Sequence, residues 1–441
     1  MSALLRAIAC VACACAPVSL ALADQAPVNQ GFFEGASSDV LIRNYYFDRD
    51  YRKGASNNFG ASRGSYRQEW AQGANLAFSS GFTQGTLGWG LDAYARGGLR
   101  LDSGGGTTGT MLLPIGDSRR AHAAFGTLGG AVKVNLSHTR LYYGDVAPAN
   151  PVFFVDTSAR LLSQLAHGWQ LISEDISGLK LDAGRFTSGV AGTGTTPDIL
   201  RSAYSDKEVK RYQYAGGRYT LSSAWDVSLF TSEAKDFWRL YYLGSNYSIP
   251  LAGKRNLRLS FNGYRSTDAG AAVAGPIDGV AGAISAAYTQ GAHTFTLVAQ
   301  KNQSDTPLDE IAFADRKASG LSLPMAMMVD EFQGPRERAF QFRYEVDMGA
   351  YAIPGLKLAM RYGIGRTDGS HVDPSSAYKG LYGPNGRHWE SNYDVQYAVQ
   401  GGWAKDLRLR LRYAVVRENK DQPLANIDEV RFIIEYPVKL L

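Results

Sequence analysis

This chain of 441 residues contains few cysteines and few long apolar runs, and its net charge is small. The three cysteines lie within the first 23 residues, so the rest of the chain can form no disulfide. Beyond residue 23, no run reaches the roughly 18 apolar residues that a membrane-spanning helix needs. The net charge is only +5 and aromatic residues make up 12% of the chain, which is not typical of a disordered protein. These absences exclude a disulfide scaffold, a bundle of membrane helices and an unfolded chain.

The first 23 residues have the pattern of a secretory signal peptide (residues 1–23). Arg6 provides the positive charge, an apolar stretch follows, and Ala21-Leu22-Ala23 provides the small residues of a cleavage site before Asp24. A lipid-modified cysteine is the alternative, but the apolar stretch before each cysteine is short. We therefore expect an exported chain whose mature domain is residues 24–441. An exported chain of this length without a disulfide is unusual for a soluble secreted domain.

Apolar and polar residues alternate in segments of about ten residues, separated by Gly, Asn, Asp, Ser and Pro. This period of two is the pattern of strands that have one apolar and one polar face. Seventeen segments show it, near residues 38–49, 66–78, 85–96, 129–142, 168–174, 178–187, 210–221, 224–233, 238–249, 256–264, 281–289, 292–301, 339–348, 356–363, 393–403, 407–415 and 430–438.

So many two-faced strands predict an all-β fold, a transmembrane antiparallel β-barrel with its apolar face toward lipid. One soluble core could not bury them all, and a propeller or solenoid would repeat a motif every 40 to 50 residues, which we do not find. Backbone groups in hydrocarbon must be paired, so the sheet has to close, and bacterial barrels of one chain close with an even number of strands. We therefore expect 18 or 16 strands in one domain.

Five poorly patterned segments, 101–128, 144–167, 187–209, 302–337 and 366–392, are expected to be long external loops. The segment from Asn150 to Gln164 is the best candidate for folding into the lumen, because its Val, Phe and Leu side chains need a surface to pack on. The alternative is that this segment packs on its neighbours outside the pore. If it folds inward, its polar residues Asp156, Ser158 and Arg160 form the constriction.

Several stretches together resemble one protein family. They include RQEWAQG from Arg67, SGFTQGT from Ser80 and LDAGRFT from Leu181, with further matches in 31–34, 39–50, 99–103, 130–133, 150–153, 160–162 and 430–441. The sequence resembles the OprD (Occ) family of outer-membrane porins of Gram-negative bacteria. The resemblance implies 18 strands, a constriction made by inward-folded loops, and a row of basic side chains that guides small carboxylate-bearing solutes. The chain ends in Lys439-Leu440-Leu441, without the terminal aromatic residue common in other barrels.

The basic residues that could guide such solutes are recognisable from parity. Arg408, Arg410 and Arg412 occupy every second position, so they share one face at intervals of ~6.6–7 Å. Leucine on the intervening positions identifies that face as the lumen, because an arginine facing lipid at the bilayer midplane costs ~2–4 kcal/mol. Parity adds four further residues on two other strands, and closure of the barrel brings a fifth, Arg431 on the last strand, beside the first strand; we call all eight the basic ladder. The five are Arg43, Arg49, Lys357, Arg361 and Arg431.

The alternative is that these side chains only stiffen the wall through ion pairs with acids such as Glu345, Asp347 or Glu435. We favour the ladder because three consecutive inward arginines with no interleaved acid would repel one another unless an anion visits them. Only Asp145 and Asp156 lie near Arg160 in the infolded segment, which favours an anionic solute.

The remaining residues do not suggest chemistry. The six histidines lack metal-site spacing, and His388 beside Glu390 and Ser391 is the only set that could resemble a catalytic group. We expect a channel, not an enzyme, with no cofactor, no metal and no nucleic-acid partner, in contact with outer-membrane lipid as a monomer or homotrimer. The alternatives are a barrel whose external loops serve adhesion or partner binding, and a porin for basic amino acids or peptides.

Overall fold

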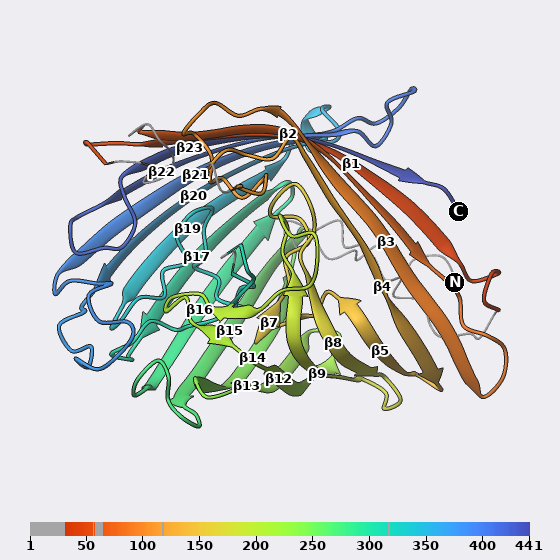
Figure 1. The fold of residues 1–441 in the computed structure, drawn as a ribbon, viewed down its shortest axis with the longest axis horizontal. Coiled ribbons are helices and arrows are strands. Elements are labelled where there is room, and N and C mark those ends of the chain that lie inside the picture. The colour runs from red at the N-terminus through yellow and green to blue at the C-terminus, as the bar shows by residue number, and fades with distance from the viewer. Residues whose placement is uncertain (1–30, 56, 58–64, 117–118, 316–317) are drawn as a thin grey trace.

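The computed structural model describes residues 31–55, 57, 65–116, 119–315 and 318–441, so the predicted signal peptide lies outside the described residues. Eighteen antiparallel strands form a single sheet (Figure 1). They are β1 (Ser37–Tyr51), β2 (Tyr66–Ser79), β3 (Leu87–Asp102), β4 (Ala124–Leu136), β5 (Thr139–Val146), β8 (Leu165–Ser173), β9 (Leu179–Val190), β12 (Tyr212–Ser222), β13 (Trp225–Ala234), β14 (Trp238–Leu251), β15 (Arg255–Asp268), β16 (Asp278–Gln290), β17 (His293–Asn302), β19 (Arg338–Asp347), β20 (Leu356–Thr367), β21 (Gly386–Ala398), β22 (Arg408–Glu418) and β23 (Ile427–Lys439).

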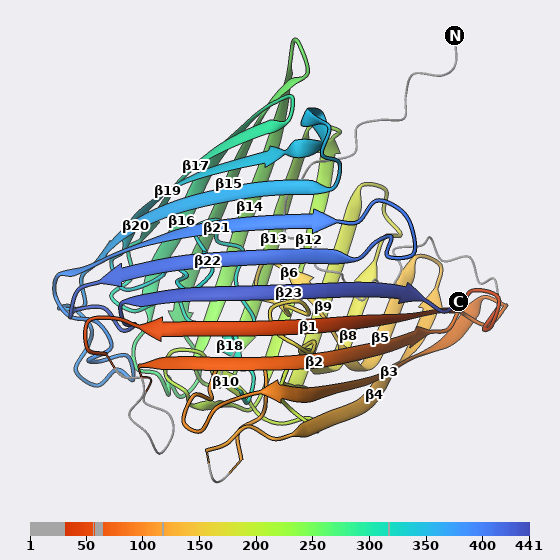
Figure 2. The same ribbon diagram turned by 90° about the horizontal axis from the view of Figure 1, so that it is seen from above.

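The sheet closes on itself. Each strand pairs with the next along the chain, and β23 pairs with β1 from Asp39↔Lys439 to Tyr51↔Ile427. Figure 2 shows β23 lying between β22 and β1. Closure leaves no unpaired edge, as the hydrocarbon of a membrane requires. The predicted barrel is therefore confirmed, with 18 strands.

The period of two separates a lipid face from a lumen face on every strand. On β19, Phe340 is 62% exposed while its neighbour Gln341 is 3% exposed. On β22, Leu411 is exposed on the outside, whereas Ala414 is buried on the inside. No helix within the described residues is long and apolar enough to cross a membrane.

The two ends of the barrel differ in their connections. At one end the turns are short, such as Ser137-His138 between β4 and β5, and β1 begins and β23 ends there. At the other end are the five long connections, 103–123, 147–164, 191–211, 303–337 and 368–385, which confirm the predicted loops. Long loops are external and short turns periplasmic in such barrels, so this end faces outward from the cell.

Two predicted segments were wrong in their bounds. Residues 129–142 are not one strand but the hairpin of β4 and β5, which turns seventeen segments into eighteen strands. The turn has no glycine, and Ser137 adopts its left-handed backbone with φ 57°. The predicted strand at 393–403 is β21, which begins seven residues earlier, at Gly386. Its early outward residues include Arg387 and Ser391, which hid the alternation.

Several of the long loops fold into the lumen. They carry β6 (Ala149–Asn150), β7 (Phe153–Phe154) and a small sheet of β10 (Leu200–Ser202), β11 (Glu208–Val209) and β18 (Ile311–Ala312), while η1 (Met348–Tyr351) lies in a turn at the other end. Phe153 is fully buried, with its ring 4.9 Å from that of Tyr212 on β12 and 5.4 Å from that of Phe186 on β9. The predicted infolding of residues 150–164 is therefore confirmed.

A buried carboxylate joins three of these loops. Asp309 accepts hydrogen bonds from the Tyr378 hydroxyl at 2.8 Å, from the Tyr204 backbone N–H at 3.2 Å and from the Ser202 hydroxyl. Burial raises the pKa of Asp309 to about 6. The loops 191–211, 303–337 and 368–385 thus share one polar junction inside the barrel.

Candidate functional site: a basic wall of the lumen

The eight residues of the basic ladder all lie on the inner face of five adjacent strands, β20 to β23 and β1. The register aligns them in four consecutive rows, each of which carries two basic side chains. From the external end, the rows contain Arg49 and Arg361, then Arg431 and Arg412, then Arg410 and Lys357, and finally Arg43 and Arg408. Rows are ~6.6–7 Å apart along a strand. The structure therefore brings together on one wall residues that span the whole sequence.

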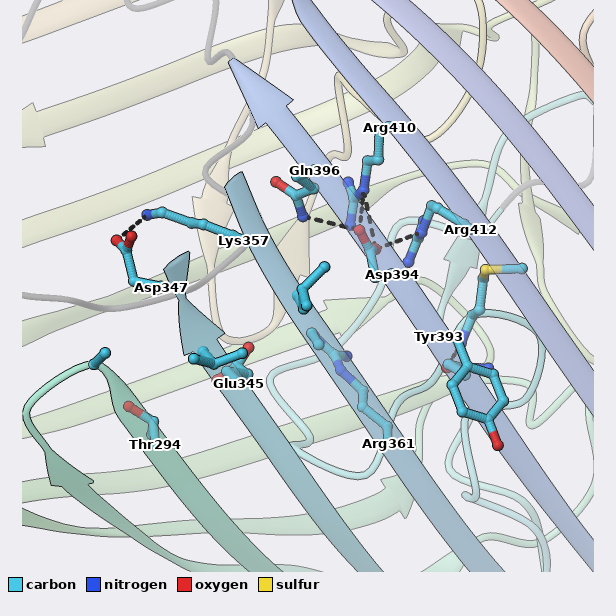
Figure 3. A pocket seen from close by; sticks show the side chains of 16 residues that line it. Thr294, Glu345, Asp347, Lys357, Arg361, Tyr393, Asp394, Gln396, Arg410 and Arg412 are labelled. Atoms are coloured by element: carbon cyan, nitrogen blue, oxygen red, sulfur yellow. Dashed lines mark hydrogen bonds and ion pairs between the residues drawn. The ribbon is translucent and has the colours of Figure 1, made fainter. Parts of the chain in front are cut away.

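Carboxylates divide this wall into small charged groups. Asp394 on β21 lies opposite Arg412 and bonds both to Arg412, at 3.0 Å, and to Arg410, at 2.5 Å (Figure 3). The premise that no acid interleaves the arginines was therefore wrong. The alternation along one strand could not reveal this acid, because the acid lies on the neighbouring strand, ~4.8 Å away across the sheet. One carboxylate shared by two arginines leaves this trio with a net charge of +1.

The trio lines a recess near the periplasmic end (Figure 3). Lys357 and Arg361 line the same recess, with Glu345 and Asp347 on β19. The Lys357 ammonium lies 3.8 Å from the Asp347 carboxylate, as the wall-stiffening alternative predicted for Asp347. Within the part of the chain that the structure describes, Arg361 has no ion-pair partner, and neither does Arg408.

A second trio lies on β23 and β1. Glu429 is fully buried and bonds to Arg49 at 2.5 Å and to Arg431 at 2.5 Å. Here too, one carboxylate serves two arginines and the group carries a net charge of +1. Nearby, Arg43 and Glu435 form a pair at 2.7 Å, which again matches the ion-pair alternative. Arg412 lies directly opposite Arg431, so the two trios are neighbours across the β22–β23 pairing.

Three guanidinium groups gather on the ring of Phe47. The guanidinium carbons of Arg49, Arg160 and Arg431 lie 5.6, 5.4 and 5.0 Å from the ring centroid. The ring faces attract cations, and this attraction is strongest where water is excluded. Phe47 thus offsets part of the repulsion between the three like charges. No sequence pattern marked this residue, because an inward aromatic side chain reads as ordinary packing.

The predicted constriction residues attach the loop 147–164 to this wall. Arg160 is 8% exposed and donates to the backbone carbonyls of Thr110 at 3.0 Å and Ala159 at 2.8 Å. Burial, and then the nearby Arg431 charge, lowers the pKa of Arg160 to about 10, so it remains charged at neutral pH. Asp156 accepts bonds from the Ser158 backbone N–H at 2.8 Å and hydroxyl at 2.9 Å, which shapes the turn before Arg160.

The wall also holds two of the infolded loops through their backbones. Arg43 donates to the carbonyl of Arg160, and Arg431 donates to the carbonyl of Met328 at 3.0 Å. The Met328 N–H in turn donates to Glu390 at 3.0 Å. The loops 147–164 and 303–337 therefore approach each other across the same basic wall.

His388, the one residue that suggested catalysis, anchors a loop. Its two ring nitrogens contact the carboxylates of Asp330 and of Glu337, the latter at 2.7 Å. With both nitrogens engaged by acids, the ring cannot serve a nucleophile as a base. Among the described residues, no group of His, Cys, Asp and Glu is placed to hold a metal ion.

A family model described as outer membrane porin, OprD family, matches residues 30–440. The chain belongs to the OprD family of porins. It is 40% identical to Porin D of Pseudomonas aeruginosa, over 95% of this chain and 94% of that protein. It is 31% identical to the porin-like protein GalP of Pseudomonas putida, over 96% of this chain and 97% of that protein.

Solved porin structures share the fold. The crystal structure of Pseudomonas aeruginosa OprD has a TM-score of 0.81 and 38% identity, covering 93% of this chain and 97% of that one. The crystal structure of Pseudomonas aeruginosa OpdK with vanillate has a TM-score of 0.83 and 31% identity, covering 93% of this chain and 100% of that one. The protein is therefore an outer-membrane porin, a passive channel and not an enzyme, and the family resemblance is confirmed.

Proposed function

We propose that this porin takes up small solutes that carry a carboxylate group, guided by the basic ladder. The observation that carries the proposal is the arrangement of four consecutive rows with two basic side chains in each. A carboxylate that leaves one row meets the next after ~7 Å, within the length of a small organic acid.

The fixed acids favour weak binding at each row. Asp394 and Glu429 each neutralise one of two arginines, so every trio attracts an anion with one net charge. Conduction requires sites that are strong enough to enter and weak enough to leave. A low-dielectric wall concentrates anions near such sites. Vanillate, named in the OpdK structure, is an aromatic carboxylate, which supports aromatic acids as one solute class.

A second candidate within the channel class is a porin for basic amino acids or peptides. Glu345 and Asp347 line the same recess as Arg361, so a solute with both an ammonium and a carboxylate would find partners for both groups. A monomer or a homotrimer of this porin could carry either class of solute.

The experiment that tests the proposal is uptake into liposomes containing the purified porin. Benzoate, benzylamine, benzyl alcohol and arginine provide one anion, one cation, one neutral solute and one basic amino acid. We expect benzoate to enter fastest. Faster entry of arginine would support the second candidate, and equal rates for the three aromatic solutes would contradict guidance by charge.

A further inference from the structure

A separate row of basic side chains lies on the outer surface of the barrel, at its external end. Lys301, Arg338, Arg366 and Arg387 lie opposite one another in the register of β17, β19, β20 and β21. All four are exposed, and their parity is that of the lipid-facing residues. We call these four residues the outer basic row. The basic ladder does not include them.

The outer basic row borders the apolar band directly. The next outward residues toward the membrane are Ala299, Phe340, Ile364 and Trp389, again opposite one another in the register. Phe340 is 62% exposed and Ile364 42% exposed, as expected of side chains that face lipid. A basic residue is costly at the bilayer midplane and nearly free at the interface. The row therefore lies at the level of the headgroups of the outer leaflet.

Acids do not neutralise this row. Within the part of the chain that the structure describes, none of its four side chains has an ion-pair partner. Outward arginines elsewhere at this end do have partners: Arg239 pairs with Glu233 at 2.6 Å, and Arg265 pairs with Asp278. Like charges directly opposite each other on neighbouring strands repel. A counter-charge from outside the chain would relieve this repulsion.

We propose that the outer basic row binds the phosphate groups of a phosphorylated glycolipid in the outer leaflet. Guanidinium groups bind phosphate through paired hydrogen bonds, and three of the four residues are arginines. The apolar residues one step below the row, from Phe340 to Trp389, provide a surface for the acyl chains of the same lipid. A free phosphate ion could use only the row, whereas the lipid uses both.

The test compares two double variants that remove the same charge. Arg338→Gln/Arg366→Gln removes the centre of the row, and Arg239→Gln/Arg265→Gln removes two outward arginines that already have acidic partners. Binding of lipid A with two phosphates, of lipid A without phosphates and of inorganic phosphate is measured on the intact porin in detergent. Retention of the heat-resistant barrel on gels checks that each variant folds.

We expect the row variant to lose about tenfold or more in affinity for phosphorylated lipid A, and the control variant to change by less than about twofold. Arg338→Lys/Arg366→Lys keeps the charge but loses the paired hydrogen bonds, so its affinity should lie between those of the native porin and the Gln variant. Equal losses in the row and control variants would overturn the proposal, as would equal binding of the dephosphorylated lipid. Inorganic phosphate that binds as tightly as lipid A would overturn the assignment to a lipid.

Discussion

Replacement of Arg412 by Gln should lower the anion preference of the channel without removing its barrel. Arg410 keeps its bonds to Asp394, at 2.5 Å for the shortest, so the trio changes from a net charge of +1 to neutral. One charge acting on an ion ~7 Å away is worth ~0.6 kcal/mol in water. This energy lowers the local concentration of anions, and raises that of cations, by a factor of about three. Salt screening reduces it, so we expect the anion-to-cation permeability ratio to fall about two- to fivefold.

The measurement is the reversal potential of single channels in a salt gradient, with the dilute side near ~0.01 M, where the Debye length is about 30 Å. Arg417→Gln is the matched control, because Arg417 lies on the same strand but faces outward, paired with Asp428 at 2.7 Å. We expect its potential to equal that of the native porin. An unchanged potential in Arg412→Gln, or an equal change in both variants, would refute guidance by the basic ladder.

Three further outcomes follow from the packing. Gly73→Val should raise single-channel conductance, because a Cβ at Gly73 would lie 2.8 Å from Leu161 Cγ and displace the infolded loop; unchanged conductance would place the narrowest point elsewhere. Glu429→Gln should lower the free energy of unfolding in urea by about 3–5 kcal/mol, because it leaves buried arginines without their shared acid, and a loss under about 1 kcal/mol would contradict this reasoning. Asp309 has its folded pKa raised from 3.8 to about 6, so its stabilising contribution is complete below pH 3.8 and is lost as pH rises through 6. Native loops should thus resist proteolysis better at pH 5 than at pH 8, and Asp309→Asn should reduce that difference; an undiminished difference would assign it to other groups.

Alternation along single strands predicted most of the fold. The leucines between Arg408, Arg410 and Arg412 identified the lumen face, and the structure confirms the closed barrel that this face requires. The hairpin at Ser137 was not predicted, because its apolar residues change from even to odd positions without a glycine or proline to mark the turn. A change of phase within an unbroken apolar pattern is the signal that would have revealed it.

The composition of the lumen wall was harder to predict, because it depends on the register between strands. The shared acid Asp394 lies within ~5 Å of Arg412 across the sheet, although 18 residues separate them along the chain. The contact between Arg160 and Phe47 also depends on the path of a loop, and a loop has no periodic pattern from which that path could be predicted. Side-chain parity therefore located the basic residues but could not assign their partners.

The bonds from Arg43 and Arg431 to loop carbonyls mean that the aperture and the charge of this channel are set by the same atoms. A substitution at either arginine removes a positive charge and also releases the backbone of a loop that narrows the passage. Size and charge discrimination cannot then vary independently at these two positions. Arg361 and Arg408 make no such bond within the described residues, so a substitution there changes the charge of the wall without releasing a loop.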